Sequence, residues 1–401
     1  VYAGFSTPSP PSNLMTKRTV KLADNTISAE EMASLADWLK EGHQVTKGPL
    51  TRQFEAEFAA YTGTKYSIMV NSGSSANLLM AFSLLEAGYR RNKKVIVPAV
   101  SWITTLSPFV QMGFECFLCD SDAKDLGVDL NHLEQLLKKE QPALLILVHI
   151  LGHPNQMDAI RRLCAQHGCL VIEDACEALG SEYKGIKTGA LSLAGSFSFY
   201  YGHHISTIEG GAITTSDDKL YSVMLSIRSH GWSRDVPETD RQAWKKEFAI
   251  DDFREFYSFY YAGYNLRSTD LNAYLGRLQL KRLPEIAKVR ARNFELYRQA
   301  LPEFWSQSSE GGFVSSFSFG TYAKNRLEVS KHLLAQGVEC RPLVCGSMGR
   351  QPFWIKKHGV THLPVADKVH DFGLYLPNHA NITPEDIAYV AKHFREVAQP
   401  C

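Results

Sequence analysis

The sequence predicts an α/β fold built on a sheet of roughly seven strands. From residue 66 onward, short apolar runs alternate with stretches whose apolar residues recur at helical spacing. Because ligands gather at the carboxyl ends of strands in such sheets, the residues just after each run are the first place to look for a site. The runs are YSIMV, VIVPA, ECFLC, ALLILV, LVIED, SFSFY and GGAITT, at 66–70, 95–99, 115–119, 143–148, 170–174, 196–200 and 210–215.

Helices are predicted on both sides of this strand-rich region. Ser28 and Glu31 form a capping-box pattern in front of the apolar positions Met32, Leu35 and Leu39. A Gly-Pro turn then leads into a second helix with Phe54, Phe58 and Tyr61 on one side. From Asp270 the apolar spacing continues to residue 301, which indicates a long helix crossing to a compact α+β unit.

A chain of 401 residues is long enough for one large domain and a smaller one. We expect residues 1–24 to form an N-terminal tail, 25–265 the large domain, and 266–401 the crossing helix with the small C-terminal domain. The first residues lack a basic segment followed by an apolar block, so we expect no secretory signal and a cytoplasmic protein.

The overall charge excludes partners that are gathered by a strong electrostatic field. The chain has 43 basic and 42 acidic residues, a formal charge of +1, so neither nucleic acid nor a membrane surface is expected as a partner. Its longest apolar run, 143–148, is far shorter than the ~20 residues that span a bilayer.

Eight cysteines are scattered through the chain, and their spacing indicates neither disulfides nor a metal site. Cys116 and Cys119 form the one C-x-x-C pattern, but they lie in a predicted strand, where positions three apart point to opposite faces. We interpret the cysteines as structural thiols.

Three strand ends carry residues suited to one aromatic, phosphate-bearing ligand. After residues 66–70, Gly73, Ser74 and Ser75 open a helix whose free N–H groups suit a phosphate, although such a turn also fits an ordinary helix cap. After 95–99, Trp102 can stack on a flat ring or pack in the core.

The third strand end supplies carboxylates. Asp174 closes the run at 170–174, and Glu177 follows three residues later. A carboxylate at this point suits the protonated nitrogen of a pyridine ring, which it keeps electron-accepting. The competing interpretation is a helix cap.

The segment 196–215, SFSFYYGHHISTIEGGAITT, resembles the part of DegT-type sugar aminotransferases that carries the cofactor lysine. The family pattern is S-F, three residues, Lys, and then E-G-G six residues on. His203 occupies the lysine position. A lysine there forms a Schiff base with pyridoxal phosphate (PLP), whereas an imidazole cannot, although it can still move a proton near neutral pH. We regard His204 as structural, and the two adjacent histidines predict no metal site, because no further ligands lie near them.

The resemblance covers residues from about 20 to the end, and it includes N-S-G-S-S-A-N, V-P-A-V-S-W and E-D-A-C-E. It implies the aspartate-aminotransferase type of fold (PLP fold type I), with a mixed sheet in a large cofactor domain, and homodimers that share their active sites. By the same resemblance, Ser198 lies near the cofactor ring and Asn265 reaches the cofactor phosphate of the neighbouring subunit. The expected substrate-binding residues are His230, Arg267 and Arg341.

A histidine in the lysine position marks a small branch of the family that removes a sugar hydroxyl. The resemblance implies that pyridoxamine 5'-phosphate (PMP) forms from PLP with L-glutamate as donor. The expected substrate is a nucleotide-diphosphate 4-keto-6-deoxy hexose, with GDP-4-keto-6-deoxymannose favoured, and His203 moves the protons that expel its C3 hydroxyl. The products are a 3-deoxy-4-keto sugar and ammonia.

Three alternatives remain open from the sequence. The chain could be a nucleotide-sugar aminotransferase or resemble the CDP-hexulose 3-dehydrases, which need an iron–sulfur cluster with about four cysteine ligands. The segment 227–247 contains no cysteine where that branch has its cluster. The third alternative is a noncatalytic, PLP-bound regulator. Segment 233–262, polar and then aromatic, is typical of an insertion that covers a substrate.

Overall fold

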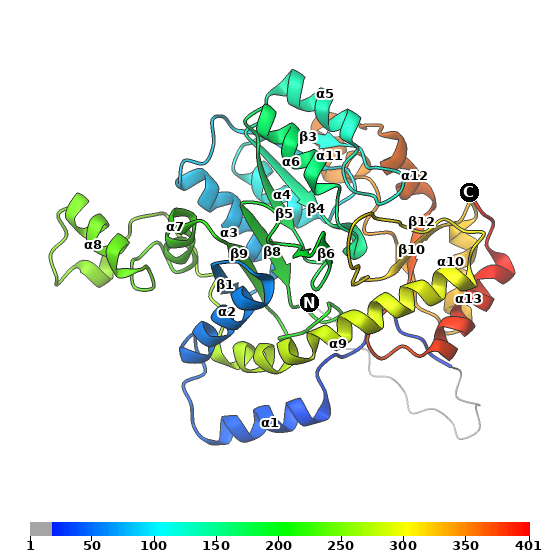
Figure 1. Cartoon of the computed structure of the whole chain (residues 1–401), viewed down its shortest axis with the longest axis horizontal. Helices are drawn as coiled ribbons and strands as arrows, with labels where there is room; N and C mark the ends of the chain where they lie inside the picture. Colours follow the sequence, from blue (N-terminus) through cyan, green and yellow to red (C-terminus); the bar gives the residue numbers. More distant parts are fainter. Residues whose placement is uncertain (1–17) are drawn as a thin grey trace.

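A seven-stranded sheet lies at the centre of the molecule in our computed structural model, which describes residues 18–401 (Figure 1). Its strand order is β1-β9-β8-β5-β4-β2-β3. All seven predicted strands are confirmed, although the sixth ends at Ser198, earlier than the run SFSFY. They are β1 Tyr66–Val70, β2 Lys94–Pro98, β3 Glu115–Cys119, β4 Leu144–Val148, β5 Leu170–Asp174, β8 Ala194–Ser198 and β9 Gly211–Thr215.

Strand directions decide where the loops of this sheet meet. Strand β9 is antiparallel to both β1 and β8, while the other neighbouring pairs are parallel. The carboxyl ends of β1, β2, β3, β4, β5 and β8 therefore lie at one edge, and β9 begins at that edge. This mixed α/β sheet confirms the predicted fold class and brings the predicted strand-end residues together.

Both faces of the sheet are covered, so its strands are buried and read as continuous apolar runs. Along β1, Ile68 and Val70 pack into the layer of α3 (Gly73–Glu86), α4 (Ile103–Gln111) and α7 (Asp218–Arg228). Met69 faces the other way, toward α2 (Pro49–Thr62) and α9 (Asp270–Ala300). On that second face, α5 (Leu130–Glu140) and α6 (Met157–Gln166) cover the strands farther along. The alternation follows from the two-residue period of a strand.

Helix α9 (Asp270–Ala300) connects the main sheet to a second packed unit, where it meets a smaller sheet (Figure 1). That antiparallel sheet has the order β10-β12-β11, with β10 Phe319–Tyr322, β12 Gly373–Leu376 and β11 Arg341–Pro342. Helices α10 (Arg326–Ala335), α12 (Pro364–Phe372) and α13 (Pro384–Val397) pack around it. Helix α11 (Pro352–His358) lies instead beside α4 and β3, where Lys357 and His358 border the same hollow as Val110 and Phe117. The exact boundaries that the sequence analysis assigned to two domains stay a prediction.

The chain before the first strand runs along both units. The tail expected at 1–24 falls largely outside the described residues, but Val20 is buried and its backbone pairs with Val338 beside the smaller sheet. Helix α1 (Ala29–Lys40) follows, and its predicted capping box is confirmed, with hydrogen bonds between Ser28 and Glu31 in both directions.

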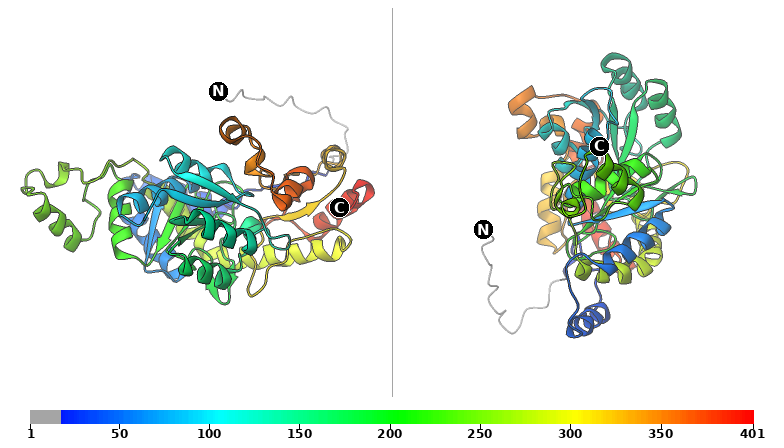
Figure 2. Two further views of the ribbon diagram at one scale, coloured as in Figure 1. Left: turned by 90° about the horizontal axis from the view of Figure 1, so that it is seen from above. Right: turned by 90° about the vertical axis from the view of Figure 1, so that its left-hand side faces the viewer.

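The remaining elements are short, apart from one projecting segment. They are the hairpin β6 (Glu182–Tyr183) and β7 (Ile186–Lys187), and the turns η1 (Ile150–Gly152), η2 (Glu255–Tyr257) and η3 (Met348–Arg350). Helix α8 (Glu238–Glu247) extends away from the main sheet, as two views show (Figures 1 and 2). Within residues 18–401, no helix has both the length and the apolar character to span a membrane. The eight cysteines are free thiols.

Candidate active site

A cavity of about 330 Å³ opens at the carboxyl edge of the sheet. Eight residues that the sequence analysis selected line it, and they come from four strand ends and from β11: Gly73, Ser74, Trp102, Asp174, Glu177, Ser198, His203 and Arg341. Gly73, Ser74, Trp102, Asp174 and Glu177 were selected from local patterns, and His203, Ser198 and Arg341 through the family resemblance. The strand directions of the main sheet account for the meeting of all but Arg341 in one place.

The turn after β1 offers backbone donors to the cavity. Ser72 caps α3 by accepting a hydrogen bond from the N–H of Ser75, at 3.0 Å, and Ser75 does not line the cavity. Gly73 and Ser74 precede it in the first helical turn, where N–H groups have no partner inside the helix. A side chain at Gly73 would come within 2.6 Å of Ser198 Cβ, so glycine lets the turn pack against β8. The result is an anion-binding helix N-terminus on the cavity wall.

Asp174 is held rigidly at the end of β5. Its Oδ2 accepts hydrogen bonds from Asn77 Nδ2 (2.8 Å) and Thr105 Oγ1 (2.7 Å), and its Oδ1 accepts one from the Cys176 N–H (3.1 Å). Asn77 in turn accepts a hydrogen bond from Ser196 Oγ on β8. Three donors hold this buried carboxyl group in one orientation. The cavity therefore has a rigidly placed carboxyl group in its floor.

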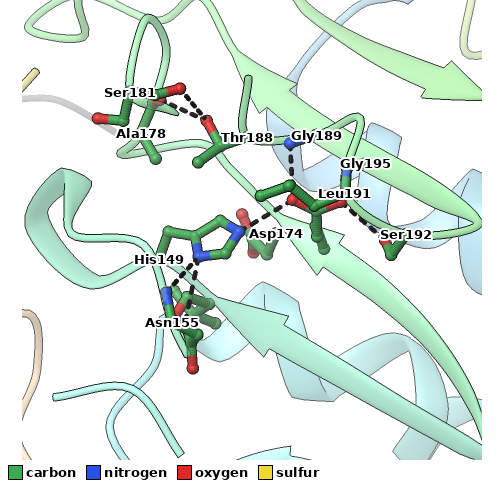
Figure 3. A network of polar contacts seen from close by, with 12 residues as sticks. His149, Asn155, Asp174, Ala178, Ser181, Thr188, Gly189, Leu191, Ser192 and Gly195 are labelled. Carbon is green, nitrogen blue, oxygen red and sulfur yellow. Dashed lines mark hydrogen bonds and ion pairs between the residues drawn. The ribbon is translucent and has the colours of Figure 1, made fainter. Parts of the chain in front are cut away.

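Behind Asp174, a second buried network fixes the ends of β4 and β5 (Figure 3). Glu173 accepts hydrogen bonds from the backbone of Gly189 and Leu191, from Ser192 Oγ, and from His149 Nε2 at 2.9 Å. His149 Nδ1 accepts from the Asn155 N–H, so Nε2 is the nitrogen that donates to Glu173. The His149 N–H donates to the Asp174 carbonyl oxygen, which ties this network to the cavity floor.

His203 faces the cavity from the loop between β8 and β9. Its Nδ1 lies 2.9 Å from the carbonyl oxygen of Cys176. A carbonyl only accepts, so Nδ1 carries the hydrogen and Nε2 keeps its lone pair. Burial lowers the pKa of His203 to about 4, so the side chain is neutral at pH 7 and Nε2 is ready to take a proton.

His204 points the other way. It is fully buried, and its Nε2 donates to the carbonyl oxygen of Ser315 at 2.9 Å. Burial lowers its pKa as well. A buried histidine that is hydrogen-bonded to the backbone is a structural residue, as the sequence analysis expected of His204.

One aromatic side chain and two ionisable side chains complete the cavity wall. Trp102 stands at its rim with 53% of its surface exposed, free to cover a flat ligand. Glu177 accepts a hydrogen bond from the Leu151 N–H, and burial raises its pKa to about 7. Arg341 reaches the cavity from the smaller sheet, where its Nε donates to the Tyr375 hydroxyl. The guanidinium gives the cavity a positive group opposite the strand ends.

Three predicted residues, Asn265, His230 and Arg267, lie outside this cavity and contact one another instead. Arg267 donates to Asn265 Oδ1 at 3.0 Å and to His230 Nε2 at 3.3 Å. Trp232 packs on His230, and the Arg267 guanidinium lies 5.7 Å from the Trp232 ring centroid. We call His230, Trp232, Asn265 and Arg267 the outer cluster.

The insertion at 233–262 also stays away from the cavity of its own chain, since none of its residues lines it. It carries exposed aromatic side chains, among them Phe253 and Phe259, which are 92% and 61% exposed. Phe259 stacks near Trp232, so the insertion and the outer cluster form one continuous surface. An insertion that covers a substrate is therefore not seen within one chain.

Sequence reasoning missed several residues of the cavity wall. Asn77 and Thr105 orient Asp174, but polar residues are common in helices, so their residue type gave no signal. Only their position near the start of the helices that follow β1 and β2 could have marked them as residues of the site. Phe317 comes from a loop without any local signal, and its ring lies 5.1 Å from that of His203. Glu209, the acidic residue of the E-G-G pattern, lines the cavity too.

Taken together, the donors fit a pyridoxal-type cofactor. The helix N-terminus at Gly73 and Ser74 suits its phosphate, the carboxyl group of Asp174 suits its ring nitrogen, and Trp102 offers an aromatic face. The described residues place no lysine on the wall of this cavity, so His203 is the wall residue at the lysine position.

Comparison with known proteins gives the same family. The chain is 35% identical over 371 residues to GDP-4-keto-6-deoxy-D-mannose 3-dehydratase of Yersinia pseudotuberculosis, covering 89% of this chain and 93% of that protein. A solved structure of the E. coli 3-dehydratase with bound hydrated PLP superposes with a TM-score of 0.86 at 31% identity, over 93% of this chain and 98% of the other. Another, of a mutant 3-dehydratase with bound GDP-perosamine, has a TM-score of 0.85 at 31% identity, over 93% and 99%. The profile of the DegT/DnrJ/EryC1/StrS aminotransferase family matches residues 25–395, and this chain belongs to that family.

Proposed function

We propose that the protein is a PLP- and PMP-dependent 3-dehydratase acting on GDP-4-keto-6-deoxymannose, with glutamate as amino donor and ammonia as a product. The observation that carries the proposal is His203, a neutral imidazole facing the cavity at the position where aminotransferases of this family have lysine. The 3-dehydratases among its relatives and structural neighbours support the substrate class.

The cofactor contributes reactivity that no side chain here has. When bound, pyridoxamine phosphate supplies an amine for the C4 carbonyl of the sugar and a ring that accepts electrons. Asp174, fixed by Asn77 and Thr105, holds the ring nitrogen protonated, and the N-terminus of α3 binds the phosphate.

His203 moves the protons. Its Nε2 has a free lone pair and, with cofactor and sugar bound, would take a proton from the cofactor carbon next to the amine. The same Nε2–H would then donate to the C3 hydroxyl of the sugar, which would leave as water. The hydrogen bond from Nδ1 to the Cys176 carbonyl keeps the ring oriented while Nε2 changes its protonation state. Histidine therefore supplies both the base and the acid of an elimination.

We also propose a homodimer whose two active sites each use both chains. Within one chain the outer cluster does not line the cavity, although its Arg267 and His230 side chains are suited to an anionic, hydroxyl-bearing ligand. The projecting insertion with its exposed aromatic side chains is available to contact a second copy. In this arrangement Asn265 of one chain binds the cofactor phosphate in the other chain's cavity. Arg267 of the same chain binds the nucleotide diphosphate there.

The iron–sulfur alternative lacks ligands. Among residues 18–401, no group of three cysteines converges as a cluster would require. Burial also raises the pKa of the Cys116 and Cys345 thiols to about 12, which disfavours their thiolates. The aminotransferase alternative predicts a product that retains nitrogen, so a product assay separates it from dehydration.

The test is product analysis with a panel of GDP-, CDP- and dTDP-linked 4-keto-6-deoxy sugars in the presence of PLP and glutamate. We expect the GDP sugar to be converted fastest, to a 3-deoxy-4-keto product, with one ammonia released and one glutamate consumed per turnover. In deuterated water, deuterium should appear at C3. A stable 4-amino sugar with its C3 hydroxyl intact would overturn the dehydratase proposal, and no turnover of any member would favour a noncatalytic regulator.

A further inference from the structure

Two histidines and a glutamate meet on the outer side of helices α10 and α13, far along the chain from the cofactor residues. His332 belongs to α10, while His393 and Glu396 lie three residues apart on α13, so both project from the same side of that helix. One potential ligand atom from each residue lies within 4.8 Å of the others. None of the three lines the active-site cavity.

The separations of these atoms resemble those around a small metal ion. Ligand atoms bound tetrahedrally at zinc distances of about 2.0–2.2 Å lie roughly 3.3 Å apart. Glu396 Oε2 is 3.3 Å from His332 Nε2 and 2.8 Å from His393 Nδ1. Small side-chain rotations would therefore bring all three atoms to bonding distance from one point.

His332 Nε2 and Glu396 Oε2 are close but poorly aligned for a hydrogen bond. The nitrogen is buried and lies 3.3 Å from Glu396 Oε2, without the geometry of a hydrogen bond. The second oxygen of Glu396, Oε1, lies 4.0 Å from Lys392 Nζ, which leaves Oε2 for the imidazoles. A metal ion between the nitrogen and the carboxylate would give both a bonded partner, which the direct contact does not provide.

The two helices form a firm frame for these side chains. Val329 and Leu333 of α10 pack with Val390 and Phe394 of α13 in one buried cluster. At one end, Tyr389 donates from its hydroxyl to the Gln336 carbonyl, and at the other, Asn325 donates to the Val397 carbonyl. The cluster is thus held by packed backbone on both sides, as a metal site requires.

We propose that His332, His393 and Glu396 bind one zinc-type divalent transition-metal ion, with water as the fourth ligand. Two imidazoles and one carboxylate are a ligand set that zinc accepts, whereas calcium and magnesium prefer oxygen ligands alone. The ion would join α10 to α13 and stabilise the unit around the smaller sheet, a role separate from the sugar chemistry.

The test is metal binding to the tag-free protein in its cofactor-bound form, after treatment with a chelator. Equilibrium dialysis against micromolar zinc should give one ion per chain, and cobalt as a probe should give the strong visible absorption of a tetrahedral site. Glu396→Gln and His332→Gln should each weaken binding by at least about 100-fold, because even the loss of a ligand's supporting hydrogen bond costs 10- to 100-fold. Zinc should raise the melting temperature of the wild type and not that of these variants.

Two matched controls separate this site from other zinc ligands. His362→Gln removes another histidine paired with a single carboxylate, Asp367 at 2.9 Å, and Cys401→Ser removes the exposed thiol. Both should bind zinc as the wild type does. The proposal is overturned if the wild type binds no zinc under these conditions, or if Glu396→Gln and His332→Gln bind it as tightly as the wild type. Loss of binding in a control variant would likewise overturn it by placing the ion elsewhere.

Discussion

The cavity wall and the outer cluster differ in how completely one chain builds them. In the wall, Asp174 and Ser198 are buried, and Asp174 has three hydrogen-bond donors of its own chain. In the outer cluster, Arg267 and Asn265 contact mainly each other and His230, beside aromatic rings that face outward. One chain therefore builds the cavity wall from its own contacts, whereas the outer cluster lies outside that cavity.

This difference has a physical origin in the sheet. The wall residues follow strands whose ends are fixed by backbone hydrogen bonds, so neighbouring loops must meet. The outer cluster lies beside β1, the edge strand of the sheet, where the backbone of Arg267 pairs with that of Val70. It also borders the projecting insertion. Residues there lie outside the cavity of their own chain, and this position supports the proposal that they serve the cavity of a partner chain.

Removing the imidazole from the cavity wall should have the largest effect. We expect His203→Asn to lower the rate of dehydration by roughly 10²–10⁴-fold, the usual contribution of a general acid–base group. Asp174 and the α3 N-terminus remain, so the variant should still bind PLP, as followed by its absorbance. A variant with wild-type ammonia release would show that His203 is not the proton carrier.

A lysine in the same position sharpens this test. His203→Lys should bind the cofactor covalently, so that borohydride followed by peptide mapping finds it on residue 203, and should lose dehydration. Wild-type protein treated in the same way should show no cofactor fixed on a lysine. A stoichiometric modified lysine in the wild type would contradict the account of the cavity.

Mixed dimers test whether the two regions act in different chains. A His203→Asn chain and an Asn265→Ala chain are each defective alone, but a mixed dimer contains one site with both wild-type residues. Random exchange should restore roughly a quarter of wild-type activity per chain, because half of the dimers are mixed and one of their two sites is intact. No recovery after verified subunit exchange would place both residues in the same site.

The outer cluster should influence substrate binding more than cofactor binding. We expect Arg267→Ala to raise KM for the nucleotide sugar by roughly 10-fold or more, the cost of losing a charge-assisted hydrogen bond, with PLP affinity little changed. Arg298→Ala is the control, because Arg298 forms an exposed pair with Glu295 on α9. An equal effect of both substitutions would argue against a specific role for Arg267.

The smallest effect concerns Glu177 and depends on pH. Burial raises its folded-state pKa to about 7, so the folded protein holds a proton that the unfolded chain loses near the ordinary value of 4.5. The folded state is therefore disfavoured as pH rises from about 4.5 to 7, and this cost persists above pH 7. Glu177→Gln should unfold like the wild type at pH 4.5 and be more stable at pH 8.

We expect this gain at pH 8 to be about 1–2 kcal/mol, less than the full pKa shift implies, because the carboxyl group borders the cavity. Urea unfolding of cofactor-free protein at both pH values measures it. A gain of equal size at pH 4.5 would mean that the carboxylate charge is not its cause.

The sequence by itself determined the strands, the turn at Gly73, the carboxylate Asp174 and the histidine at position 203. These features depend on residues close together in the chain: apolar runs, a glycine with hydroxyl residues before a helix, and a motif of fixed spacing. The α/β sheet with its ligand edge was also predictable, because alternating strands and helices leave few arrangements, whereas its mixed strand directions were implied only by the family resemblance.

Only the tertiary structure decided which of these residues share a cavity. Asn77 and Ser196 lie 119 residues apart and are joined by one hydrogen bond, and Phe317 reaches His203 from a loop without a pattern. The same holds for the separation of the outer cluster from the wall and for the meeting of His332 with Glu396 across two helices. Such contacts depend on how whole helices and sheets pack together, and local spacing in the chain does not encode the distance between elements that are remote from each other.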